Sequence, residues 1–247
     1  GSEMCIRDSF SPEAVAEGQR KFMGTLQNTY AFFVLYANID NFDPKDHPIE
    51  NVKLTLMDKW VLSRLHQLVR RVDEDLCAYR IPEPARAITE FVDDLSNWYV
   101  RRCHERFWGK GMEGDKLAAF ETLYTVLTTL CGLCAPYIPF MTETMYQNLV
   151  VGNLPGAKES VHLTDFPTAD MSLVDAKLEE DMEAVIAIVQ LGRACRSAAN
   201  MKVRQPARAL YVKGAKLPEA MAALIADELN VTNVESVSYK HLRAHET

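Results

Sequence analysis

The sequence lacks the short motifs with which many self-contained enzymes bind nucleotides or metals. It has no GxxxxGK[ST] phosphate loop, no GxGxxG after a strand and no HExxH pair. Neither a Ser–His–Asp grouping nor a pair of carboxylates suited to acid–base catalysis can be argued from the residues. These absences favour a binding or structural role over an independent enzyme.

An excess of positive charge is also missing. The net charge is −7 over 247 residues, which excludes a nucleic-acid binder that works by bulk charge. Any site for a polyanion must therefore be a local patch on an acidic body.

Cysteine is scarce, with six residues in the whole chain. Most of these cysteines lie in segments with apolar helical spacing, and so low a number indicates reduced thiols and a cytoplasmic location. The segment "CGLC" at 131–134 has the spacing of a metal or redox pair, but no second pair of ligands is placed to complete a zinc site. We expect these two thiols to be buried and reduced, with no metal.

One long uncharged run, Thr122–Thr142, has the length of a membrane span. Pro136 and Pro139 interrupt it, and it contains five threonines and two tyrosines. The run therefore predicts a buried core helix followed by a second, proline-started helix, and no membrane association.

Apolar residues recur at helical spacing through most of the chain, which predicts a mainly α fold. The clearest stripe in the second helix is Val61, Leu65, Leu68, Val72, Leu76 and Tyr79, and in the third helix it is Ile88, Phe91, Val92, Leu95, Trp98 and Tyr99. A proline-rich loop is predicted at 41–51. The predicted helices span 12–38, 56–79, 83–108, 115–135, a short segment ending near 149, and 174–199.

The pattern changes near the C-terminus. Strand-like segments at 207–214 and 230–237 flank a helical segment at 217–229. We therefore predict a helical bundle over 10–167, followed over 168–238 by a long helix and a small α/β piece. The ends, 1–9 and 239–247, show no periodicity and resemble non-native flanks.

Basic residues are concentrated in one segment. Between Arg193 and Lys216 there are seven Lys or Arg and no acid. Arg193 and Arg196 can be explained by the dipole at the C-terminus of the long helix. Lys202, Arg204 and Arg208 lie beyond that helix and predict a phosphate-binding surface.

A second cluster, "DDLSNWYVRRCHERFWGKG" at 93–111, mixes aromatic and basic residues. Trp98 and Tyr99 continue the apolar stripe and are predicted to be core. Trp108 and Lys110, at the glycine-rich helix end, fit a core least well, and aromatics beside guanidinium groups suit unstacked RNA bases. Composition alone does not decide whether the basic residues Arg101, Arg102 and Arg106 belong to an RNA-binding surface or to an ordinary exposed helix face.

Seven segments resemble one protein family. In order they are "KFMGTLQNTYAFFVLYANID", "MDKWVLSRL", "DDLSNWYVRRCHERFW", "APYIPFMTETMYQNL", "SVHLTDFP", "MKVRQPARAL" and "DELNVTNVE". From about Phe10 to Val237 they resemble the region of isoleucyl-tRNA synthetases that follows the catalytic core. "SNWYVRR" and "APYIPF" are similar to the helical anticodon-binding domain of class I synthetases, and "KVRQP" with "ELNV" is similar to the isoleucine enzymes in particular.

This resemblance implies a fold, an activity and partners. It implies a helical bundle of the class I anticodon-binding type leading into a small α/β piece, which binds an isoleucine-accepting tRNA beside catalytic and editing domains of the same parent chain. The parent would use ATP and Mg to join isoleucine to tRNA. The family's HIGH and KMSKS signatures are absent from this sequence, so we expect this portion to be inactive alone and to bind no cofactor itself.

The resemblance also suggests tRNA-contacting residues. In many relatives an Arg stands two residues after the "NT" of the first helix, but here Tyr30, Ala31 and Phe32 follow, so that contact is not carried over. Two alternatives remain: a structural or protein-binding helical module, and the equivalent domain of a valine or leucine synthetase. The predicted tRNA-binding residues are Asn28, Arg101, Arg102, Arg106, Trp108, Lys110, Lys202, Arg204, Gln205 and Arg208.

Overall fold

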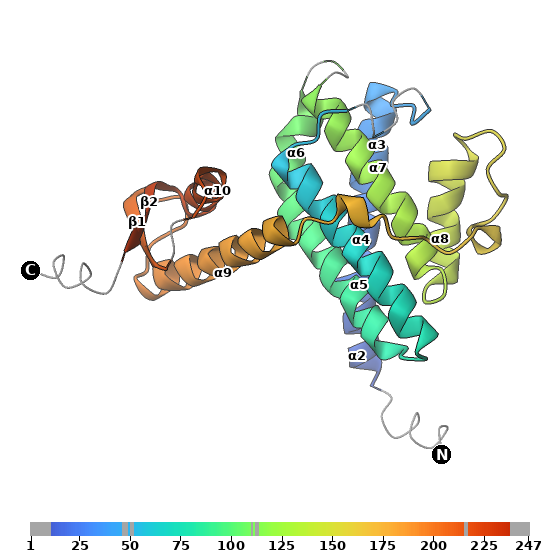
Figure 1. Ribbon diagram of the computed structural model, residues 1–247, viewed down its shortest axis with the longest axis horizontal. Coiled ribbons are helices and arrows are strands. Elements are labelled where there is room, and N and C mark those ends of the chain that lie inside the picture. The colour runs from blue at the N-terminus through green and yellow to red at the C-terminus, as the bar shows by residue number, and fades with distance from the viewer. Residues whose placement is uncertain are drawn as a thin grey trace, which may run out of the picture. The chain divides into compact units, whose positions relative to one another are not determined.

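The fold is mainly helical, with one small sheet near the C-terminus (Figure 1). The chain divides into two compact units, residues 1–174 and 175–247. The predicted helical bundle followed by a small α/β piece is thereby confirmed. The predicted flanks, 1–9 and 239–247, lie outside the described residues, since the computed structural model describes 11–45, 49, 52–109, 111, 114–214 and 217–237.

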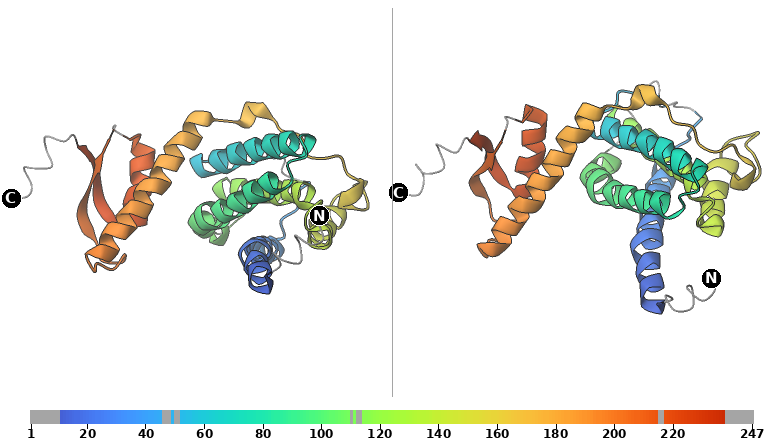
Figure 2. Two further views of the ribbon diagram at one scale, coloured as in Figure 1. Left: turned by 90° about the horizontal axis from the view of Figure 1, so that it is seen from below. Right: turned by 60° about the horizontal axis from the view of Figure 1, so that its bottom comes forward.

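The first unit is a helical bundle. The elements are α2 Pro12–Gly18, η1 Gln19–Met23, α3 Gly24–Asp40, α4 Leu56–Cys77, α5 Pro82–Asp94, η3 Leu95–Val100, α6 Arg101–Trp108, α7 Asp115–Cys134, α8 Pro139–Tyr146, η4 Gln147–Val151, η5 Val161–Leu163 and η6 Met171–Leu173. In this bundle α4 and α5 lie side by side in both views of Figure 2, and α7 packs against α4. Three π-helical turns, η1, η3 and η4, continue the rods of the helices that they adjoin.

Helix α4 begins where the sequence places a capping box. The Thr55 side chain accepts a hydrogen bond from the Asp58 amide at 3.4 Å, and the Asp58 carboxylate accepts one from the Thr55 amide at 2.8 Å. These reciprocal bonds satisfy backbone donors that the first turn would otherwise leave unpaired. The same Asp58 side chain is completely buried, so the start of α4 also brings a carboxylate into the bundle.

The predicted apolar stripe of α4 is confirmed except at its end. Val61, Leu65 and Val72 are at most 1 % exposed. The prediction for Tyr79 is wrong: this residue lies past the helix end, has a φ of 58° and is 90 % exposed. Once the chain has left the helix, helical spacing no longer decides which way a side chain points.

The predicted third helix consists of α5, η3 and α6 joined end to end. Its six stripe residues, Ile88 through Tyr99, are all buried. Farther along, Phe107 is fully buried and its ring lies 4.9 Å from that of Phe120 on α7, which itself lies 6.0 Å from Phe33 on α3. Aromatic rings from three helices thus form the centre of the bundle.

Helix α7 contains the first part of the uncharged run that resembled a membrane span, and the proline-started α8 contains its end. Helix α7 is long and apolar enough to cross a bilayer by length and composition, but two-thirds of its most apolar stretch, 67 %, is buried inside the bundle. Cys131 and Cys134 are fully buried free thiols, as predicted. Burial raises the pKa of Cys131 to about 12 and raises that of Cys134 as well, which keeps both protonated at neutral pH.

The first unit extends to Val174, past the predicted boundary between 167 and 168. The segment after 167 stays with the bundle because it binds α4: the Asp170 amide donates a hydrogen bond to Nδ1 of His66 at 3.1 Å. The apolar pattern of this short segment is too weak to reveal such a contact from sequence.

The second unit comprises a long helix and a βαβ motif. Its elements are α9 Ala176–Ala198, β1 Ala207–Lys213, α10 Glu219–Leu229 and β2 Val231–Val237. The strands pair in parallel, from Ala207 opposite Val231 to Lys213 opposite Val237, because α10 returns the chain to the same end of the sheet. In both views of Figure 2, α9 and α10 lie on one side of the strands.

Candidate nucleic-acid interface

The first unit carries a partly exposed group of rings contributed by α3 and α6. Trp108 is 56 % exposed, and its Nε1 donates a hydrogen bond to the Tyr36 hydroxyl at 2.6 Å. The His104 ring lies edge-on to Trp108 at 4.3 Å and stacks on Phe32 at 4.9 Å. We call Phe32, Tyr36, His104 and Trp108 the aromatic surface.

The contacts beneath the aromatic surface fix the ends of its two helices. Lys116, only 7 % exposed, donates to the carbonyl of Gly109 at 2.8 Å and pairs with Asp40 at 2.7 Å. Because Gly109 ends α6 and Asp40 ends α3, one buried cation joins both helix ends. Trp108 is therefore held in place from two sides, by Tyr36 and by the backbone that follows it.

Asn28 and Arg101 lie beside this aromatic surface. Asn28 is exposed one turn before Phe32, and Arg101 is exposed nearly one turn before His104, so each shares a helix face with a ring. Nε of Arg101 donates to the carbonyl of Asn97 at 2.8 Å. Of the predicted residues, Asn28, Arg101 and Trp108 thus lie on the helix faces that carry the aromatic surface.

Of the two other predicted residues of this cluster, the structure describes only Arg102. Arg102 is half-buried, so it presents less of its guanidinium group than Arg101 does. Lys110 lies outside the described residues. The sequence argument missed three rings of the aromatic surface, Phe32, Tyr36 and His104. The i, i+4 spacing of Phe32 to Tyr36 and of His104 to Trp108 was the available signal.

The structure corrects the prediction for Arg106. Its side chain is 14 % exposed and makes two hydrogen bonds of 2.8 Å to the fully buried carboxylate of Asp58. A further ion pair of 2.9 Å joins it to Asp115, and Tyr99 donates to Asp58 at 2.7 Å. Arg106 therefore ties α6 to the starts of α4 and α7, and it is not carried into the proposed RNA surface.

Electrostatics agree with this internal role. Burial by itself would raise the pKa of Asp58, but the hydrogen bonds and charge of Arg106 and the Tyr99 hydroxyl lower it below the ordinary 3.8. The same carboxylate raises the pKa of Arg106 despite the burial of that guanidinium. Both groups are thus charged at neutral pH and neutralise each other.

In the second unit, a buried arginine shapes the segment after α9. Arg196 is 7 % exposed, and its Nη1 donates to the carbonyls of Lys202 at 3.1 Å and Gln205 at 2.9 Å. Its Nη2 donates to the carbonyls of Leu229 at 2.6 Å and Asn230 at 3.2 Å. One guanidinium group therefore joins the turn after α9 to the end of α10.

Asn230 holds the same turn from the other side. It has a φ of 48° at the end of α10, and its Nδ2 donates to the carbonyl of Arg204 at 2.9 Å. Asparagine tolerates this left-handed conformation better than most residues. Asn230 Nδ2 also lies 3.5 Å from the carbonyl of Val203, so two side chains from elsewhere in the unit hold all four carbonyls of 202–205.

The side chains of this turn take no part in those contacts. Lys202, Arg204, Gln205 and Arg208 are all exposed, and within the described residues none of these four side chains makes a hydrogen bond or ion pair. We call 202–208 the basic segment. The structure brings together all four residues that the sequence predicted here.

The two remaining described arginines of the basic region serve the fold. Arg193 pairs with the buried carboxylate of Glu228 at 2.6 Å, and Arg196 binds the carbonyls given above. The helix-dipole explanation of these two residues is therefore incomplete, because their partners lie on α10 and in the turn. In the described part of this region, the arginine and lysine side chains that remain available to bind an anion are those of the basic segment, which follows α9 as predicted from the sequence.

Most of the chain matches a known protein family in sequence. The family described as the anticodon-binding domain of tRNA ligase matches residues 58–211, which is more than half of the chain. The chain belongs to this family. The match begins at the buried Asp58 and runs through the basic segment into β1, so it includes residues of both units.

Several relatives of this chain are isoleucine–tRNA ligases. The chain is 51 % identical over 226 residues to the isoleucine–tRNA ligase of Clostridium acetobutylicum, 47 % identical over 228 residues to that of Clostridium tetani, and 43 % identical over 226 residues to isoleucine–tRNA ligase 2 of Bacillus cereus. These matches cover 92 %, 91 % and 90 % of the chain.

The chain spans about a fifth of the length of the relatives it matches: 22 %, 22 % and 21 %. Among the residues that the structure describes, no group of three or more His, Cys, Asp or Glu side chains is arranged to hold a metal ion.

Proposed function

We propose that this chain is the tRNA-binding, anticodon-recognising portion of an isoleucine–tRNA ligase. The observation that carries the proposal is the basic segment. Its backbone is fixed by Arg196 and Asn230, while Lys202, Arg204 and Arg208 project into solvent without internal partners in the described part of the chain. A fixed backbone that presents separated cations suits a phosphate chain.

The aromatic surface supports the same function by a different chemistry. An exposed indole ring held at its nitrogen by Tyr36 offers a flat face on which an unstacked base can stack. Asn28 and Arg101 border that face, and an exposed amide can hydrogen-bond a base edge. Gln205 offers a second amide within the basic segment.

The parent activity follows from the isoleucine-specific relatives. The whole protein would join isoleucine to its tRNA with ATP and Mg in the cytoplasm, and its catalytic and editing domains would be the intramolecular partners of this portion. Because HIGH and KMSKS do not occur in the sequence, we expect the isolated chain to catalyse no isoleucine-dependent exchange between ATP and pyrophosphate. Exchange that persists through stringent purification would contradict this assignment.

Binding to anticodon hairpins tests the function. The anticodon stem–loop of an isoleucine tRNA should bind more tightly than that of a valine tRNA, measured by fluorescence anisotropy at one salt concentration. Equal affinity for both hairpins would leave RNA binding without the proposed specificity. No binding to either would favour the structural-module alternative.

A further inference from the structure

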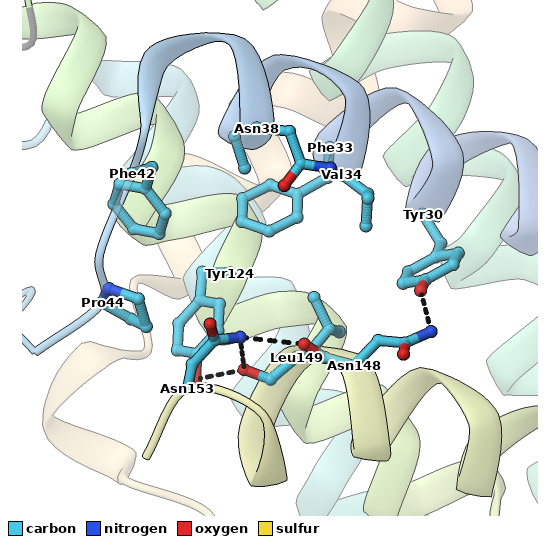
Figure 3. Close-up of a pocket in the computed structure, with 11 residues that line it drawn as sticks. Tyr30, Phe33, Val34, Asn38, Phe42, Pro44, Tyr124, Asn148, Leu149 and Asn153 are labelled. Atoms are coloured by element: carbon cyan, nitrogen blue, oxygen red, sulfur yellow. Dashed lines mark hydrogen bonds between the residues drawn. The ribbon is translucent and has the colours of Figure 1, made fainter.

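A pocket of about 380 Å³ opens on the first unit between α3, α7 and η4 (Figure 3). Its floor is apolar and aromatic, formed by Phe33, Tyr30 and Leu149, which are 2 %, 8 % and 3 % exposed. Phe42 and Tyr124 form one wall. The volume lies within the range of pockets that hold small molecules or single ring systems.

The rim of the pocket consists of carboxamides. Asn38 from α3 lies across the open centre from Asn148 and Asn153, as Figure 3 shows. All three are exposed, so their amide groups stand at the mouth while the rings lie below. No Lys, Arg, Asp or Glu lines the pocket, which makes it unsuited to a phosphate or a carboxylate.

The amides retain hydrogen-bonding capacity toward the pocket. Asn148 Nδ2 donates to the Tyr30 hydroxyl at 2.8 Å, and Asn153 Nδ2 donates to the carbonyls of Asn148 at 2.8 Å and Leu149 at 3.1 Å. These bonds use the amide nitrogens and leave both carboxamide oxygens as acceptors. For Asn38, no hydrogen bond is found among the described residues, so it offers both a donor and an acceptor.

The pocket and the aromatic surface lie on different faces of α3. Asn28, Phe32 and Tyr36 follow one another at four-residue spacing, and so do Tyr30, Val34 and Asn38. At 100° per residue, the two series are separated by roughly half a turn of the helix. A ligand in the pocket is therefore separate from one stacked on Trp108.

We propose that this pocket receives one unstacked base of the bound RNA loop, with its ring over the aromatic floor and its hydrogen-bonding edge at the Asn38, Asn148 and Asn153 amides. Aromatic faces with neutral donors and acceptors match an uncharged, planar heterocycle, which is how proteins read single-stranded RNA. The assignment rests on the proposed RNA-binding function. It places two bases of one splayed loop on opposite sides of α3.

The test combines abasic RNA with pocket variants. Isoleucine anticodon hairpins in which each loop base is removed in turn are titrated against the intact chain and against Asn38→Ala and Val34→Trp. Neither variant removes an internal hydrogen bond of the described chain, and the second fills the pocket. Gln27→Ala, at an exposed site three turns before Asn38 on α3, is the matched control.

We expect the intact chain to lose between about fivefold and about 150-fold in affinity when the pocketed base is removed. Val34→Trp should bind the complete hairpin that much more weakly, and for this variant removal of the same base should cost almost nothing further. Asn38→Ala keeps the aromatic floor and the other two amides, so it should lose only part of the affinity and show a smaller abasic penalty than the intact chain. Gln27→Ala should behave as the intact chain does.

The outcomes separate the pocket from the function. If both pocket variants bind the hairpin and still lose as much affinity as the intact chain when the base is removed, the pocket assignment is overturned and the proposed function stands. Binding of no hairpin at all would overturn the proposed function and, with it, an RNA base as the occupant. A free nucleoside that binds as tightly as the hairpin would show a small-molecule site and overturn the RNA assignment.

Discussion

The aromatic surface of the first unit and the basic segment of the second unit are held in place by different means. In the aromatic surface the functional side chains bind one another, as Trp108 does through Tyr36 and His104. In the basic segment the backbone is fixed and the functional side chains are left without internal partners among the described residues.

This difference matches two kinds of RNA contact. A stacked base requires a ring at a defined position, so a pre-assembled group of side chains is suitable. A phosphate tolerates variation in where a flexible cation meets it, and an exposed Lys or Arg can adjust while the backbone sets the register. We therefore expect the aromatic surface to contribute to base recognition and the basic segment to salt-dependent affinity.

Each region also depends on one buried arginine, Arg106 in the first unit and Arg196 in the second. Neither guanidinium group is available to RNA, because Arg106 binds Asp58 and Arg196 binds four backbone carbonyls. Substitution of these residues should affect stability first, and substitution of exposed residues should affect binding first.

The largest effect on stability is expected for Arg106→Ala. The change leaves the Asp58 carboxylate buried without its cation, which costs about 3–5 kcal/mol in the free energy of unfolding. Urea denaturation of the variant and of the intact chain measures the difference. If Arg106→Ala weakened RNA binding while stability stayed unchanged, the internal role assigned to Arg106 would be wrong.

The pH dependence provides a control for that prediction. Because the folded-state pKa of Asp58 is lowered, its contribution is present above the ordinary pKa of 3.8 and is lost as the pH falls through the folded value. Asp58→Asn should therefore weaken the unit at neutral pH and remove this part of the acid sensitivity. A variant with unchanged acid sensitivity would show that Asp58 does not govern it.

A somewhat smaller loss is expected for Arg196→Ala. Four carbonyls lose a charged donor, and a loss on the order of 3 kcal/mol in the second unit follows from unpaired buried groups. Unfolding monitored by hydrogen exchange of α9, β1 and α10 measures this change. Arg204→Ala, which removes an exposed cation from the turn that Arg196 fixes, should leave the exchange rates unchanged; similar effects from both changes would contradict the support role.

Trp108→Ala should change binding more than stability. Removal of an exposed stacking ring is expected to cost about 1–3 kcal/mol in hairpin binding, while the dependence of affinity on salt stays unchanged, because no charge is lost. Trp108→Phe, which retains a ring without the Tyr36 hydrogen bond, should restore part of the affinity. If Trp108→Ala also reduced the dependence of hairpin affinity on salt, the aromatic surface and the basic segment would not differ in the kind of RNA contact that they make.

The sequence was sufficient to predict the helices, the two strands to within one residue at an end, and the basic segment. Periodic apolar residues in long helices depend on local spacing, and the stripe from Ile88 to Tyr99 is buried throughout. The exposure of Lys202, Arg204 and Arg208 was also predictable, since they follow the end of a helix and lie on no apolar stripe.

Contacts between distant residues could not be predicted in this way. Arg106 resembles its exposed neighbours in sequence, and its partner Asp58 lies 48 positions away. The amides around the pocket come from α3 and from the region after α8, and Asn38 and Asn153 have no feature that distinguishes them from surface residues. Tertiary proximity, which one sequence does not encode in any local pattern, decides the role of each.

The salt dependence of hairpin binding tests the central claim most directly. Affinity of the isoleucine anticodon hairpin is measured across a range of salt concentrations for the intact chain, for Lys202, Arg204 and Arg208 all changed to Ala, and for the charge-matched control with the exposed Lys53, Lys59 and Arg86 changed to Ala. Each neutralised phosphate contributes about 0.7–0.9 to the slope of log affinity against log salt. The first triple should flatten the slope by roughly two units and the control should leave it nearly unchanged; equal slopes for the two triples would contradict a shaped phosphate site in the basic segment.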